Sequence, residues 1–377
     1  MIACFLVSSR CGLRAERRSA CRSVLRSILL SAAVAMSAWS VGQTAKADEL
    51  FVGDAGDNTV KHFDASSGAY LGTFVPSGTA GLNGPTGMIF SDGQLVLVNQ
   101  NVGNNFGEIL RFDGATGMFI GKLVSSSDRG APFAPQGIVR GEPGDRFYVA
   151  DVGTQGNTCD SQGNVKEYGI SGAFLGNLDR GKFKAAFYPR GVVFGPDGLL
   201  YVAARGCPIS KNPDDGLIGY VLRFNPRSRK FIDVFASNTS VHDLHRPEGL
   251  VFDSEGNLWV TSFRNNADPM DTDKILKLDG KTGQLLATLA LWTPGVTPRA
   301  FAQAILFGPE GKLFIPITGN DPATTGQIRR CDPKTLPLQC DVIVKAGTAL
   351  QSPWFLIFRK SDPATLSYQA EQADGRD

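Results

Sequence analysis

The residues best suited to chemistry form one short segment, His242-Asp243-Leu244-His245-Arg246-Pro247-Glu248. His242, His245 and Glu248 are candidate catalytic residues, because imidazole and carboxylate groups transfer protons when they lie beside a substrate. Arg246 adds a fixed positive charge that could clamp an anion. A solvated loop with no catalytic role is the competing interpretation. The third histidine, His62, alternates with apolar residues, so we expect it to have a structural role in an outer strand.

The end of this segment, Pro247-Glu248-Gly249, is one copy of a corner that recurs along the chain. Each copy precedes a short apolar strand. The other copies, the last two degenerate, are Pro85-Thr86-Gly87, Pro135-Gln136-Gly137, Pro189-Arg190-Gly191, Ala302-Gln303-Ala304 and Ser352-Pro353-Trp354. Successive copies lie about 50 to 58 residues apart, which is the period of a four-stranded propeller blade.

Each corner leads into the same order of strands and turns. After Pro247 come an apolar strand at 250–252, an Asp-Ser-Glu-Gly turn at 253–256 and a strand rich in β-formers at 257–262. A hairpin this short cannot bury its own faces, so it needs neighbours of the same kind. With two further strands per repeat, the sequence predicts an all-β fold, a six-bladed propeller of four-stranded antiparallel blades.

The two ends of the repeat region complete one blade between them. The last corner is followed by only one strand, at 354–358, whereas three strands, at 49–53, 59–63 and 70–75, precede the first corner. We therefore expect the ring to close with three N-terminal strands and one C-terminal strand. The propeller would span residues 48–358, and residues 359–377 would form a flexible polar tail.

Residues 1–47 read as a cleavable signal peptide. Six arginines precede an apolar run at 28–41, which is too short to span a membrane, and Ala45-Lys46-Ala47 resembles a cleavage site. An uncleaved membrane anchor is the alternative. Cleavage predicts a periplasmic or secreted protein with no membrane span. It also removes a net charge of +6, so the mature chain carries −4. We expect no nucleic-acid partner, because no basic patch remains.

Four cysteines remain after cleavage: Cys159, Cys207, Cys331 and Cys340. An even number in an exported chain indicates disulfide bonds, and four cysteines allow three pairings. We favour Cys331–Cys340, within one hairpin, and Cys159–Cys207, between equivalent loops. A metal site is the rival interpretation, although the chain has no Cys-x-x-Cys pair and few histidines.

The corners should place polar side chains around the propeller axis. The middle residues of the six corners are Thr86, Gln136, Arg190, Glu248, Gln303 and Pro353, and the ends of the second strands add Asp54, Asn99, Asp151, Arg205, Ser262 and Thr318. Together they predict a polar funnel of mixed charge. Its predicted ligand-binding residues are Gln136, Arg190, Arg205, Glu248 and Gln303. The alternative is that these groups only solvate the channel entrance.

The repeats over residues 49–358 resemble those of NHL-type six-bladed propellers and, more distantly, the gluconolactonase and strictosidine-synthase-like group. This fold hosts lactonases, lyases and binding scaffolds. The resemblance to gluconolactonases implies a divalent metal on the axis, held by carboxylates and Asn. The candidate ligands here are Asp54, Asn99, Asp151 and Glu248. Arg190 in the same ring opposes a cation, so no cofactor is predicted, and a divalent cation such as calcium is kept as an alternative.

Three functions remain open. The leading hypothesis is a scaffold that binds an unidentified small molecule or protein at the channel mouth. The alternative is a lactonase-like hydrolase or lyase that uses His242, His245 and Glu248, with or without a divalent cation. A redox propeller with a quinone cofactor is a third option that no residue specifically supports.

Overall fold

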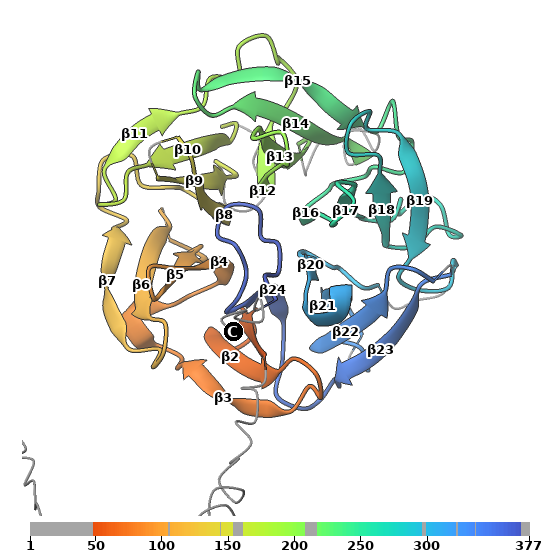
Figure 1. Cartoon of the computed structure of the whole chain (residues 1–377), viewed down its shortest axis with the longest axis horizontal. Coiled ribbons are helices and arrows are strands. Elements are labelled where there is room, and N and C mark those ends of the chain that lie inside the picture. Colours follow the sequence, from red (N-terminus) through yellow and green to blue (C-terminus); the bar gives the residue numbers. More distant parts are fainter. Residues whose placement is uncertain are drawn as a thin grey trace, which may run out of the picture. The chain divides into compact units, whose positions relative to one another are not determined.

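The computed structural model describes residues 48–370, except 105, 144, 154–160, 208–216, 296–298, 322 and 336. The chain divides into two units, Met1–Lys46 and Ala47–Asp377, and the first unit lies outside the described residues. The second unit contains six four-stranded antiparallel sheets. They are arranged as six blades around a central axis (Figure 1). The predicted fold class is therefore confirmed.

Five blades are formed by consecutive strands. The first two are β4 (Pro85–Ser91), β5 (Gln94–Asn99), β6 (Glu108–Asp113) and β7 (Phe119–Val124), then β8 (Pro135–Gly141), β9 (Arg146–Asp151), β10 (Asn164–Tyr168) and β11 (Phe174–Asn177). The third is β12 (Tyr188–Phe194), β13 (Leu200–Arg205), β14 (Gly219–Asn225) and β15 (Lys230–Ser237). The last two are β16 (Leu250–Phe252), β17 (Leu258–Ser262), β18 (Lys274–Leu278) and β19 (Leu285–Ala290), then β20 (Leu306–Phe307), β21 (Leu313–Ile317), β22 (Gln327–Asp332) and β23 (Gln339–Val344).

The sixth blade joins the two ends of the propeller, as predicted. Its strand order is β24 (Pro353–Phe358), β1 (Glu49–Asp54), β2 (Thr59–Asp64) and β3 (Tyr70–Val75). Strand β24 pairs antiparallel with β1, with Leu50 opposite Phe358. This pairing joins the two ends of the propeller in one sheet, so the first strand and the last strand are hydrogen-bonded to each other.

The corner glycines explain how closely the inner strands approach the axis. A Cβ atom on Gly137 would lie 2.8 Å from the carbonyl oxygen of Arg190, and one on Gly191 would lie 2.3 Å from that of Glu248. Any side chain at these positions would therefore collide with the backbone of the next blade. The Pro-x-Gly corner is thus a packing contact between consecutive blades, and its middle residue points into the ring.

Residues 359–370 do not form the expected loose tail. After β24 the dark blue chain crosses the centre of the ring (Figure 1). The carbonyls of Pro363 and Ala364 accept hydrogen bonds from the backbone N–H groups of Arg140 (2.8 Å) and Phe194 (3.0 Å). Leu366 is 5% exposed and lines the axial channel. This packing was not predicted, because the segment lies outside the repeat.

The predicted disulfide Cys331–Cys340 is confirmed, and it joins directly opposite residues of β22 and β23. Cys207 is also disulfide-bonded. Its predicted partner, Cys159, lies outside the described residues, so that pairing stays a prediction. Within residues 48–370, where they are described, no helix has the length and apolar character needed to cross a membrane.

Replacing Leu366 with Ala should destabilise the propeller, because it removes the apolar side chain that packs in the channel. Buried Leu-to-Ala changes typically cost about 2–5 kcal/mol of unfolding free energy. The matched control is Leu286→Ala, the same change at a side chain that is 53% exposed on β19. Urea unfolding of both variants measures the difference. Equal, small losses would show that residues 359–370 only rest on the surface.

Candidate functional site

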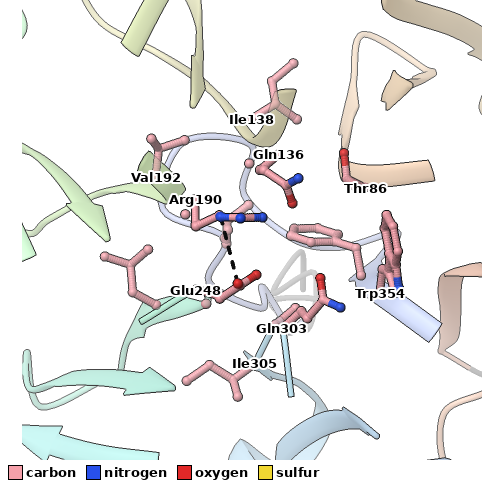
Figure 2. A pocket seen from close by; sticks show the side chains of 16 residues that line it. Thr86, Gln136, Ile138, Arg190, Val192, Glu248, Gln303, Ile305 and Trp354 are labelled. Carbon is pink, nitrogen blue, oxygen red and sulfur yellow. Dashed lines mark ion pairs between the residues drawn. The ribbon is translucent and has the colours of Figure 1, made fainter. Parts of the chain in front are cut away.

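The middle residues of the corners converge on the axis. Thr86, Gln136, Arg190, Glu248 and Gln303 come from the inner strands or corners of five blades and line one cavity. Figure 2 shows their side chains pointing toward one another across the channel. The repeat therefore builds a ring of polar groups, as the sequence predicted.

The sixth member of this ring is Trp354, not Pro353. Pro85 lies opposite Asn99 in β4 and β5, and Pro353 lies opposite Asp54 in the sixth blade. Pro353 therefore occupies the first position of the corner, and the following residue is the one that faces the channel (Figure 2). The predicted channel residue of this degenerate corner, Pro353, was therefore wrong by one position.

The ring opens into a wider cavity of about 330 Å³, which we call the funnel. Its lining residues are Gln100, Gln136, Arg190, Arg205, Glu248, Phe263, Phe301, Gln303, Thr318, Gly319 and Trp354. All five residues predicted to bind a ligand line it. A cavity of this size matches the small end of known ligand pockets.

Deeper along the axis the channel becomes narrow and apolar. Ile138, Val192, Leu250 and Ile305 follow the polar ring, and the free volume falls to about 30 Å³. This space holds one or two water molecules at most. Because Leu366 also lines this part, the funnel ends against apolar side chains.

Glu248 is the acidic group of the funnel and is 6% exposed. Its Oε1 lies 3.2 Å from Nη1 of Arg205 and 3.8 Å from Nε of Arg190. Burial raises the pKa of the Glu248 carboxyl, and the guanidinium groups of Arg190 and Arg246 oppose this rise. Two arginines thus share one carboxylate, which leaves an excess of positive charge.

The Nε atoms of Arg190, Arg205 and Arg246 are buried and have no hydrogen-bond partner among the described residues. Buried donors normally find an acceptor, so unpaired ones are uncommon in folded proteins. Arg190 and Arg205 line the funnel, whereas Arg246 does not line it and contacts the ring of Phe263. The two arginines that line the funnel therefore retain unused hydrogen-bonding capacity beside the cavity.

The other metal candidates have structural contacts of their own. Both oxygens of Asp54 accept backbone N–H groups, from Gln351 (2.8 Å) and Ser352 (2.7 Å), and Lys61 Nζ lies 2.7 Å from Oδ2. The oxygens of Asp151 accept the N–H groups of Phe133 and Ala134 in the same way. These carboxylates hold the segments that enter the corners.

Asn99 belongs to the same set, because its Oδ1 accepts the N–H of Asn83 at 2.8 Å. Neither Asn99 nor the two aspartates line the funnel with Glu248. One carboxylate beside two arginines does not provide the several oxygen ligands that calcium requires. The residues present do not fit the axial metal that the gluconolactonase resemblance implies.

The two histidines of the candidate catalytic segment lie apart from Glu248. Neither His242 nor His245 lines the funnel. The side chain of His242 is 95% exposed, whereas His245 is 4% exposed. Burial and the nearby ammonium group of Lys274 lower the pKa of His245. The backbone N–H of His245 donates to Ser262 Oγ at 2.9 Å, which fixes the segment before the corner.

Two aromatic residues of the funnel wall, Phe263 and Phe301, were not predicted. Their rings meet edge to face with centroids 5.8 Å apart. The guanidinium of Arg299 lies 4.0 Å from the Phe301 centroid, and that of Arg246 lies 5.6 Å from the Phe263 centroid. Such cation–π contacts stabilise a ring and a cation together. Phe263 directly follows β17, so extending the strand-end rule by one residue would have found it.

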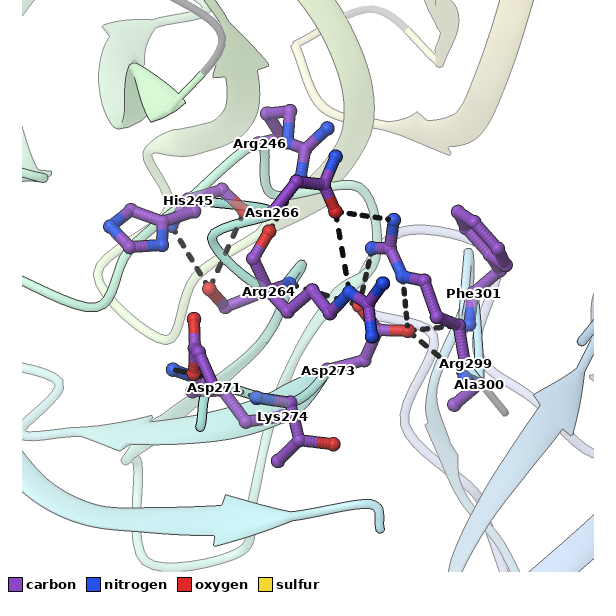
Figure 3. Close-up of polar contacts among 12 residues, drawn as sticks. His245, Arg246, Arg264, Asn266, Asp271, Asp273, Lys274, Arg299, Ala300 and Phe301 are labelled. Carbon is purple, nitrogen blue, oxygen red and sulfur yellow. Dashed lines mark hydrogen bonds and ion pairs between the residues drawn. The ribbon is translucent and has the colours of Figure 1, made fainter. Parts of the chain in front are cut away.

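Asp273 holds this wall together. Its carboxylate accepts the N–H groups of Arg264 (2.9 Å), Ala300 (2.9 Å) and Phe301 (3.0 Å) and pairs with Arg299 Nη2 at 2.6 Å (Figure 3). Both oxygens of Asp273 are therefore occupied by arginine and backbone groups. Asp273 links the fourth and fifth consecutive blades behind the funnel.

Replacing Asp273 with Asn should strongly destabilise the protein at neutral pH, because the buried Arg299 would lose its carboxylate. Breaking a buried ion pair from one side typically costs about 3–5 kcal/mol. Chemical unfolding checks this, with Asp268→Asn as the control, since Asp268 is exposed in the same loop. Similar unfolding free energies for the two variants would contradict the role given to Asp273.

Acidification should remove the stabilisation that the Asp273 carboxylate contributes. Burial opposes ionisation of Asp273, but the hydrogen bond and charge of Arg299 outweigh it and lower the pKa. A lowered folded-state pKa means that the stabilisation is complete above about pH 3.9, the unfolded value, and is lost as the pH falls through the folded value. The stability gap between the parent protein and Asp273→Asn should therefore shrink below about pH 4. A gap that stays constant from pH 7 to pH 3 would contradict this expectation.

No protein-family profile and no curated protein matches the chain. Among solved structures, the hydrazine synthase of Kuenenia stuttgartiensis is 16% identical, with a TM-score of 0.50 over 76% of this chain and 74% of that chain. Virginiamycin B lyase from Staphylococcus aureus is 15% identical, with a TM-score of 0.46 over 78% of this chain and 80% of that chain. A structure described as a gluconolactonase is 15% identical, with a TM-score of 0.46 over 80% of this chain and 91% of that chain.

These identities are low, so the likeness concerns the fold alone. The strand order of the structure itself confirms the six-bladed propeller that was inferred from the repeats. Reaction and ligand do not follow from it, because propellers host many activities.

Proposed function

We propose that this protein is an exported binding propeller that holds a small organic anion in its funnel. The observation that carries the proposal is the pairing of Arg190 and Arg205 with a single buried carboxylate, Glu248. A carboxylate ligand in the funnel would meet two guanidinium groups that share a single counter-charge. Gln136 and Gln303 add neutral hydrogen-bonding groups to the same wall.

The aromatic side of the funnel supports a ligand with an apolar part. Phe263, Phe301 and Trp354 line the cavity together with the arginines. Ligand pockets commonly combine such apolar surface with a few charged or polar groups that orient the ligand. An aromatic or short aliphatic carboxylate fits both requirements and the volume of about 330 Å³. A small molecule is therefore favoured over a protein partner.

Export is part of the proposal. The Cys331–Cys340 disulfide suits an oxidising compartment such as the periplasm or the extracellular space. The basic and apolar pattern of residues 1–47 is typical of a signal peptide, although these residues lie outside the described part. We also keep the NHL-type assignment of the repeats as a proposal that rests on the sequence.

The hydrolase or lyase alternative receives less support. It requires His242, His245 and Glu248 to act on one substrate, and the lining of the funnel contains only Glu248 of these three. A proton-transfer residue must come within hydrogen-bond reach of the reacting group. No observation favours the quinone-dependent redox alternative.

Charge changes in the funnel should alter ligand affinity in opposite directions. Benzoate is a suitable probe, because it combines a carboxylate with an aromatic ring. Arg190→Gln should weaken benzoate binding at least about 10-fold, since a hydrogen bond to a charged group contributes about 1.5–3 kcal/mol. Glu248→Gln should tighten it, because the arginines lose their competing carboxylate. Isothermal titration and Trp fluorescence measure both changes.

Benzylammonium, with the same ring and the opposite charge, is the matched control ligand and should not bind. Arg227→Gln and Glu255→Gln make the same charge changes at exposed turn positions and should leave affinity unchanged. A funnel that prefers benzylammonium or calcium, and that loses the ligand in Glu248→Gln, would refute anion binding and restore the metal-dependent alternative.

A further inference from the structure

A second group of residues outside the funnel has the composition of a metal site. His242, Asp243 and His245 each offer a ligand atom, and these atoms lie within 4.8 Å of one another. The three residues occupy the turn just before the corner at Pro247. Small rotations of exposed side chains would bring the ligand atoms to the spacing of a coordination sphere.

The buried member of the group has an unpaired nitrogen. His245 is 4% exposed, and its Nδ1 has no hydrogen-bond partner among the described residues. A buried imidazole nitrogen normally has a partner, so this atom needs an explanation. Its ring meets that of His242 edge to face at 6.0 Å, which puts the exposed imidazole beside the buried one.

The backbone holds His245 in place. Its N–H donates to Ser262 Oγ, and its carbonyl accepts the N–H of Phe263 at 2.9 Å. These contacts anchor the turn to the end of β17. A ligand on a fixed backbone loses less conformational freedom when a metal binds.

The charges around Asp243 also leave its carboxylate available to bind a metal ion. Its Oδ1 lies 3.5 Å from His242 Nδ1 and 3.5 Å from Lys274 Nζ. Lys274 makes a closer contact with Asp271, which neutralises its charge. The carboxylate of Asp243 is partly exposed and can turn toward a cation without leaving Lys274 unpaired.

We propose that His242, Asp243 and His245 bind one divalent transition-metal ion of the zinc type. Two imidazoles and one carboxylate are a common ligand set for Zn²⁺, whereas calcium and magnesium prefer oxygen ligands. The exposure of His242 and Asp243 leaves the remaining coordination positions open to solvent. This site is separate from the funnel and does not depend on the anion proposal.

The test uses the full chain without an added histidine tag, after treatment with EDTA. Isothermal titration with Zn²⁺ should show one ion per chain, and Co²⁺ should give visible absorption bands from nitrogen and oxygen ligands. His242→Ala should weaken Zn²⁺ binding at least about 10-fold, because it removes one of three protein ligands. This change is safe for folding, since His242 is exposed. Asp243→Asn should also weaken Zn²⁺ binding.

The matched control is His62→Ala. His62 lies on β2 and is the one other histidine of the chain. It stacks on Phe51 and takes no part in the group. Affinity unchanged in His62→Ala and lost in His242→Ala would support the site. The proposal would be overturned if the parent protein did not bind Zn²⁺ at about 0.1 mM, a limit that still detects weak binding. Equal Zn²⁺ affinity of the parent protein and His242→Ala would also overturn it.

Discussion

The close contact between corner backbones is the constraint on which the rest of the propeller depends. Gly87, Gly137, Gly191 and Gly249 each leave room for the backbone of the next inner strand, where a Cβ atom would lie within 2.8 Å of another atom. This approach draws the inner strands together and makes the axial channel narrow. It also orients the preceding residue of each corner into the channel. Packing and site geometry are therefore consequences of one motif.

The side chains on this ring decide what the funnel can bind. A ring of small or neutral residues would leave a plain solvated entrance, but here Arg190 and Glu248 occupy neighbouring corners. Arg205 then joins them from the end of β13. Because burial strengthens electrostatic interactions, the imbalance between arginines and carboxylate favours a negatively charged ligand. The aromatic wall behind it depends on Asp273, which connects two blades.

Much of this arrangement could be predicted from the sequence, because the repeat has a fixed phase. The phase identifies Gln136, Arg190, Glu248 and Gln303 as channel residues, and the structure places all four there. It fails at Ser352-Pro353-Trp354, where the corner lacks glycine and the proline marks the first position. Strand pairing, rather than motif spacing, is needed to find the correct residue.

Contacts between blades were harder to predict than contacts within them. Phe263 and Phe301 are far apart in the sequence, and only the fold brings their rings together. Leu366 lies outside any repeat, so its packing in the channel has no sequence signal. His245 does not line the funnel, and its backbone is hydrogen-bonded to Ser262 and Phe263 at the end of β17, contacts that motif spacing does not reveal.

The most direct test of this account is the benzoate affinity of Gly191→Ala, measured at a temperature where the variant stays folded. The new Cβ would lie 2.3 Å from the carbonyl oxygen of Glu248, so the corner must shift and the arginine–glutamate geometry must change. We predict affinity at least about 10-fold weaker than in the parent protein. Gly121→Ala is the control, because its Cβ would meet no atom closer than 3.6 Å. Parent-like affinity in Gly191→Ala would contradict the claim that corner packing positions the site.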